Sequence, residues 1–184
     1  MRIARSLPLS AGLLAFTLAG CGIMPDMPSF SLTNTEGLPE VATAVMAPTE
    51  GNKVSGQVRF VRKGNDTLVE ISLRNLTPGE HGIHIHERGD CGSPDGLSAG
   101  AHYNPTGVSH GGLEGVHHLG DLGNITAGAD GTVNLNFHLK DLKLSGEPNI
   151  SGRAVIVHAA PDDFKTQPTG NSGKRLACGV IEHS

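Results

Sequence analysis

Short runs in which apolar and polar residues alternate are the feature that most constrains the fold of this chain. In residues 67–76, Val69, Ile71 and Leu73 alternate with polar side chains, and residues 132–139 alternate in the same way. Because successive side chains of a strand point to opposite faces, this period of two predicts strands with one buried face. The sequence contains no convincing amphipathic helix, so an all-β fold is favoured.

Clusters of glycine, proline, asparagine and aspartate separate these runs and indicate turns, as at 63–66 and 130–131. About eight short strands are predicted, over residues 41–46, 53–61, 67–76, 81–87, 116–126, 132–139, 153–158 and 176–181. Such a series is typical of an antiparallel sandwich or barrel. The glycine-rich residues 88–115 are predicted to form a long loop, which a compact fold accommodates when the loop is functional or tied down.

The N-terminus has the pattern of a secretory signal. Arg2 and Arg5 precede an apolar stretch that is too short for a settled membrane-spanning helix. The stretch ends in Leu-Ala-Gly-Cys at 18–21, which resembles a bacterial lipobox with Cys21 as the lipidated residue. We therefore expect a lipoprotein signal peptide over 1–20, a lipid-anchored flexible tether over 21–40 and one domain over 41–184. The alternative is ordinary cleavage nearby, with Cys21 as a spare thiol.

The net charge and the cysteines indicate which ligands the protein binds and in which compartment it lies. Removal of residues 1–20 takes away two arginines and no acidic residue, so the formal net charge of −4 becomes −6. An acidic mature chain argues against nucleic-acid binding. If Cys21 is lipidated, Cys91 and Cys178 remain as one pair in an exported protein, which predicts one disulfide. Gly22 is not the aspartate associated with inner-membrane retention, so the expected place is the cell envelope or periplasm, with the outer membrane favoured.

Residues 81–87, His-Gly-Ile-His-Ile-His-Glu, contain the first candidate ligands. On a strand, His84 and His86 share one face and Ile83 and Ile85 share the other. Two imidazoles on a rigid strand can chelate copper or zinc, and Gly82 leaves room for another group to approach on the histidine face. Taken alone, the pair is about as often a polar sheet face as a metal site.

Further ligand-type residues follow in the chain, which favours the metal interpretation. Together with the pair they provide six histidines and one aspartate: His84, His86, His102, His110, His118, His158 and Asp121. This set exceeds the need of one tetrahedral site and suffices for two metals that share a ligand. Imidazoles with one carboxylate suit zinc, and an imidazole-only set suits copper.

These motifs resemble those of copper–zinc superoxide dismutases. The resemblance rests on the stretch 81–87, Gly-Ala-His-Tyr-Asn-Pro at 100–105, His-Leu-Gly-Asp-Leu-Gly-Asn at 118–124 and Gly-Lys-Arg-Leu-Ala-Cys-Gly-Val-Ile at 173–181, and it covers about residues 41–183. It implies an eight-stranded antiparallel Greek-key β-barrel, an immunoglobulin-like sandwich architecture, with the metals outside the barrel under two long functional loops.

The resemblance also implies a role for each site residue. Copper is expected on His84, His86, His102 and His158, and zinc on His102, His110, His118 and Asp121. Asp162 matches the carboxylate that orients ligands of both metals, and Cys91 and Cys178 match the family's disulfide. Arg175 and the bridging His102 are the expected catalytic residues, the first for binding the substrate and the second for proton delivery.

The implied reaction converts two superoxide anions and two protons to oxygen and hydrogen peroxide. Two rival interpretations are a periplasmic copper- or zinc-binding protein without catalysis and a purely structural lipoprotein; the complete ligand set and Arg175 argue against both. A homodimer is a further expectation, with its interface undefined. Lys174 stands where a small residue is usual, and with Lys165 it is a candidate contributor to a local positive field.

The remaining histidines have simpler interpretations. We expect His81 to be a core histidine with its hydrogen bonds satisfied, because it shares a face with Ile83 and Ile85. His117 adjoins His118 but points to the opposite face of an extended segment, and His138 and His183 lie near strand or chain ends, where solvation is expected.

Overall fold

The structure is a computed structural model that describes residues 38–184. The predicted signal peptide over 1–20, the lipidation site Cys21 and nearly all of the predicted tether over 21–40 lie outside the described residues. Between residues 38 and 184, the structure has no helix of the length and apolarity that a membrane span requires.

Eight strands form, as the alternating pattern predicts. They are β1 (Glu40–Pro48), β2 (Ser55–Lys63), β3 (Asp66–Arg74), β4 (Gly79–His86), β5 (Asp121–Ala127), β6 (Val133–Lys140), β7 (Ala154–His158) and β8 (Arg175–His183), with one short 3-10 helix, Leu97–Ala99. The prediction that a strand begins near 116 is wrong, since β5 begins at Asp121. Gly120 instead bonds to loop and strand backbone, donating to Tyr103 O and accepting from Ile85 N, which holds the preceding segment against β4 as a loop.

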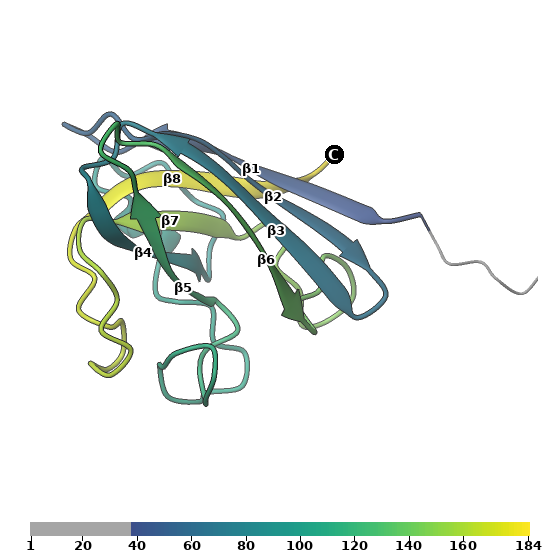
Figure 1. Cartoon of the computed structure of the whole chain (residues 1–184). Coiled ribbons are helices and arrows are strands. Elements are labelled where there is room, and N and C mark those ends of the chain that lie inside the picture. The colour runs from purple at the N-terminus through teal and green to yellow at the C-terminus, as the bar shows by residue number, and fades with distance from the viewer. Residues whose placement is uncertain (1–37) are drawn as a thin grey trace, which may run out of the picture. The chain divides into compact units, whose positions relative to one another are not determined.

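The strands pair in the order β5-β4-β7-β8-β1-β2-β3-β6 (Figure 1). β8 pairs with β1 on one side and with β7 on the other, so it joins the two halves of the sheet. The connections from β3 to β4 and from β6 to β7 cross between the halves, which gives a nearly closed, antiparallel Greek-key barrel. The expected fold class is confirmed.

The core is mostly aliphatic, and alternation decides which side chains enter it. On β3, Val69, Ile71 and Leu73 are buried between exposed or half-buried neighbours, as expected. β6 differs, because Val133 is buried but Leu135 on the same face remains 40% exposed. β5 and β6 are the two end strands and do not pair, so the barrel leaves an open seam there and Leu135 lines a surface groove instead of the core.

Two long loops lie on the side of the barrel formed by β4, β5 and β7 (Figure 1). The first follows β4 and the second joins β7 to β8. The predicted disulfide is present: Cys91 in the first loop is bonded to Cys178 on β8, with their Cα atoms 5.7 Å apart. Cys91 packs beside Ala99 and Ile156, so the bridge fixes the loop to the barrel wall.

Cys91→Ser should reduce the free energy of unfolding by about 4–5 kcal/mol in the chain-entropy model, because the bridge closes a loop across 87 positions. Chemical denaturation of the metal-free protein measures the change. Cys178→Ser and the double variant serve as controls and should give the same loss. A single variant as stable as the wild-type protein would contradict a structural role for the bridge.

Candidate metal centre

β4 and β7 supply three of the histidines, and each strand has an irregularity where a ligand lies. The pairing of β4 with β5 shifts between Gly82 and His84, and the pairing of β7 with β8 shifts between Val157 and His158. Bulges re-aim side chains out of the regular pleat. Here they turn His84 and His158 toward the same volume outside the barrel.

Gly82 provides the room that the sequence predicts. A Cβ atom at this position would lie 2.8 Å from Ser172 Oγ of the second loop and 3.2 Å from the His84 ring. The Gly82 backbone NH donates to Ala160 O of the same loop at 2.9 Å. The second loop therefore approaches β4 closely at this point because no side chain intervenes.

The first loop brings His102 to the strand histidines. His102 forms an isolated antiparallel bridge with His86, and the next residue, Tyr103, donates its backbone NH to Ile85 O at 2.8 Å. His102 is thus fixed to β4 by backbone pairing, as though it belonged to one further strand, although it lies in an otherwise irregular segment.

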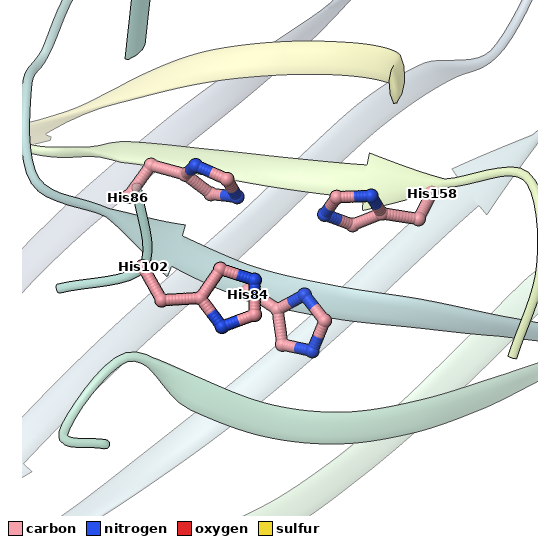
Figure 2. A group of neighbouring side chains, drawn as sticks. All are labelled: His84, His86, His102 and His158. Carbon is pink, nitrogen blue, oxygen red and sulfur yellow. The ribbon is translucent and has the colours of Figure 1, made fainter. Parts of the chain in front are cut away.

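Four buried histidines form the first group: His84, His86, His102 and His158. One ring nitrogen from each lies within 4.8 Å of the corresponding nitrogen of every other member. Figure 2 shows the rings of His86 and His158 facing one another, with His84 and His102 beside them. An imidazole-only set of this kind suits copper.

The second group consists of His102, His110, His118 and Asp121, all buried and within the same limit of one another. The Nδ1 atoms of its three histidines converge on the Asp121 carboxylate, at 2.8 Å for His102, 3.0 Å for His110 and 3.3 Å for His118. Three imidazoles and one carboxylate suit a tetrahedral zinc ion. His102 belongs to both groups, so one imidazole connects the two.

The hydrogen bonds of the rings show which nitrogen of each remains for a metal. His86 Nδ1 donates to Gly100 O at 2.9 Å, and His158 Nδ1 donates to Gly173 O at 3.3 Å. Within residues 38–184, six buried ring nitrogens have no hydrogen-bond partner: His84 Nδ1, His86 Nε2, His102 Nε2, His110 Nδ1, His118 Nδ1 and His158 Nε2. Buried polar atoms without partners are costly, so six of them converging on two points fit two metal ions.

Asp162 connects the two groups through hydrogen bonds to the ring nitrogens that are not left for a metal. Its Oδ2 accepts from His84 Nε2 at 2.8 Å, and its Oδ1 accepts from His110 Nε2 at 2.9 Å and from Phe164 N at 2.7 Å. Gly170, with φ 64°, lies directly against this carboxylate, and a Cβ atom there would come within 1.9 Å of Asp162 Oδ1. Carboxylates in this position fix the tautomer and orientation of metal-binding histidines.

The comparison with known families agrees with this geometry. The family model for copper/zinc superoxide dismutase (SODC) matches residues 54–181, which cover most of the chain. The chain belongs to the copper/zinc superoxide dismutase family. Members of this family are oxidoreductases with copper and zinc as cofactors, and this protein is a superoxide dismutase of that kind.

Burial lowers the pKa values of three histidines of this superoxide dismutase, which favours metal binding. It lowers the pKa of His84 to about 4, of His86 to about 2 and of His158 to about 3, because a charged ring is poorly solvated there. The rings are therefore neutral at physiological pH, the form that binds a metal. Burial alone would raise the pKa of Asp121, but hydrogen bonds from His102 and from the His118 NH hold it below its usual value.

The metal-free superoxide dismutase should lose stability as the pH falls from 7 to 5.5. The pKa values of His84, His86 and His158 are lower in the folded protein than the usual 6.5, so the unfolded chain binds more protons in this range. Stability falls by up to about 1.4 kcal/mol per pH unit for each ring below its unfolded pKa. Urea denaturation with a chelator present measures the effect, and equal midpoints at both pH values would contradict it.

An open cleft of about 580 Å³ leads to the first group, with His86 and His158 in its wall. Arg175 and Lys174 also line it, whereas Lys165 is not among its lining residues. The Arg175 guanidinium donates to Gly96 O at 2.7 Å and to Gly100 O at 2.6 Å, so the first loop holds it at the cleft. The Gly100 carbonyl thus accepts from both Arg175 and His86.

The other histidines lie where the sequence analysis expects. His81 is buried with satisfied ring nitrogens, since Nδ1 donates to His158 O at 2.8 Å and Nε2 can accept from the Thr77 hydroxyl at 3.3 Å. His138 and His183 are exposed, and His117 belongs to neither group. Sequence reasoning missed the Gly100 and Gly173 carbonyls that orient His86 and His158. No side-chain signal could have found them, because the contacts are made by backbone.

Proposed function

We propose that this superoxide dismutase removes superoxide in the cell envelope, with copper held by the first histidine group and zinc by the second. The six unpartnered buried nitrogens, arranged in two groups around the shared His102, carry this proposal. A further support is the cleft, whose lining includes Arg175 together with His86 and His158 of the first group and no residue of the second group. A small anion in the cleft would therefore lie beside the first group.

Arg175 binds the substrate, and His102 delivers a proton to the product. Bound copper supplies the one-electron chemistry, and zinc is redox-silent. Arg175 attracts the superoxide anion and orients it at the cleft floor, since its charge is held there by two carbonyl groups. His102 would carry a proton on Nε2 for the peroxide product when that nitrogen is not bound to copper, and its Nδ1 lies 2.8 Å from Asp121 in the second group.

The rival function is metal buffering without catalysis. A storage site has no need for a cationic side chain at an open channel, and Arg175 occupies that position here. Superoxide consumption by the metal-loaded protein decides between the two functions. A buffer would bind both metals and leave superoxide decay at the rate of free solution.

Metal analysis of the reconstituted protein, alongside a superoxide-consumption assay, tests the assignment. One copper and one zinc per chain are expected, and full activity in a copper-free sample would refute it. His118→Ala and His117→Ala form a matched pair of neighbouring substitutions. The first should lose zinc because His118 Nδ1 lies 3.3 Å from Asp121, and the second should retain both metals.

The envelope location depends on the N-terminal signal. Lipid attachment at Cys21 and anchoring to the outer membrane are part of the proposal, and so is a homodimer. Cys21→Ser should abolish labelling by a radioactive fatty acid and leave the domain active, and labelling at the wild-type level would contradict the lipid assignment. Sedimentation analysis of the metal-loaded domain tests the dimer.

A further inference from the structure

The cleft above the first histidine group contains charges of both signs. Its cations are Lys174 and Arg175, and its carboxylates are Glu50 and Asp95. The four side chains together carry no net charge. This is an unexpected lining for a channel whose substrate is an anion, because a net positive field would speed its entry.

Two separate segments bring the carboxylates to the same rim. Glu50 lies in the connection between β1 and β2, and Asp95 lies in the first long loop. They meet at Pro94, whose carbonyl accepts the Glu50 backbone NH at 2.7 Å. Both carboxylates are exposed to solvent at the cleft.

The same contacts tie this rim to Arg175. Thr49, next to Glu50, donates its hydroxyl to Arg175 O at 2.7 Å, and Gly96, next to Asp95, accepts from the Arg175 guanidinium. Asp95 also interacts electrostatically with Arg175. A hydrogen bond from the Leu97 NH lowers the pKa of Asp95, so this carboxylate is ionised at neutral pH. The backbone segments that carry both carboxylates are therefore fixed beside Arg175, and Asp95 interacts with it directly.

We propose that Glu50 and Asp95 are specificity-determining residues that weaken the positive field of the cleft and so limit the entry of superoxide and other small anions. The proposal rests on the function proposed above and adds two residues that the metal sites do not include. Neither carboxylate belongs to either metal-binding group, so both can be neutralised without removing a ligand.

The expected effect follows from Coulomb's law in water. A unit charge about 10 Å from the path of an anion changes the rate of entry about twofold at low ionic strength. Removal of both carboxylates should therefore raise the rate about fourfold. Salt at 0.15 M reduces the Debye length to about 8 Å, so the advantage should shrink as salt is added.

Glu50→Gln, Asp95→Asn and the double variant test this inference. The substitutions remove a charge and preserve shape, and Asn keeps an oxygen that can accept from the Leu97 NH. Glu182→Gln is the matched control, since it removes the same charge near the far end of β8, about 23 Å along the strand from Arg175. Pulse radiolysis at equal copper content gives rates across a salt series, and optical titration with azide gives the affinity for a small anion.

The inference predicts faster superoxide consumption and tighter azide binding in both single variants, with the largest effect in the double variant. Glu182→Gln should match the wild-type protein. Unchanged rates and azide affinities, or an equal gain in Glu182→Gln, would overturn the inference. A wild-type protein that holds both metals and consumes no superoxide would refute the proposed function instead, so the two failures are distinguishable.

Discussion

Asp162→Asn should lower the affinity for copper by about 10- to 100-fold, with a smaller loss for zinc. Asp162 Oδ1 accepts two hydrogen bonds, from His110 and Phe164, whereas Oδ2 accepts one, from His84. The amide oxygen of asparagine should take the place of Oδ1, which leaves the amide NH₂ facing the His84 Nε2–H. Two donors then oppose one another, and the His84 ring loses its fixed orientation.

Competition with a chromogenic chelator measures both affinities. Asp163→Asn is the matched control, because Asp163 is exposed and its carboxylate accepts hydrogen bonds from Lys165 and Thr166 of its own turn and from no metal-binding histidine. Asp162→Ala should weaken both metals, since it removes both acceptors. The role of Asp162 would be refuted by wild-type affinities in both Asp162 variants, or by an equal loss in Asp163→Asn.

Loss of the Arg175 charge should lower the rate of superoxide consumption about tenfold in Arg175→Ile, and about a further tenfold in Arg175→Glu. The chain has a formal net charge of −4, which would become −6 if the predicted signal peptide is removed, so the overall field opposes an anion. Arg175 counters this field locally, and glutamate replaces attraction with repulsion. The wild-type rate should fall with added salt, and the rate of the Glu variant should fall less or rise.

A structural role for Arg175 is the competing explanation, because its guanidinium binds Gly96 O and Gly100 O. Gly100 O also accepts from His86 Nδ1, so the substitutions can disturb a copper ligand as well. Arg175→Lys separates the effects, since it retains the charge and loses the paired geometry. Pulse radiolysis at equal copper content provides the rates. Equal losses in the Ile and Glu variants, with parallel salt curves, would rule out electrostatic guidance.

The sequence was a sound guide to local structure and to residue types. Alternation located the β3 core residues correctly, and the same period placed His84 and His86 on one face of a strand. It failed at Leu135, where the strand formed but this one side chain of its apolar face remained exposed. Alternation predicts which side chains share a face of a strand. Whether other residues cover that face depends on which strands pair, and β5 and β6 do not.

The amino-acid pattern alone predicts the fold class, the metal-binding residue types, the strand that presents His84 and His86, and the close approach of a second segment at Gly82. These are properties of a few neighbouring residues, because the period of a strand and the size of a side chain act locally. The ring nitrogen that remains for a metal depends instead on the folded arrangement, since the contacts that occupy the other nitrogen come from other segments of the chain. Asp162 reaches His84 across 78 positions and His110 across 52. The folded arrangement also brought Glu50 and Asp95 into the same cleft lining as Arg175, since this lining forms only after two loops have packed beside β8.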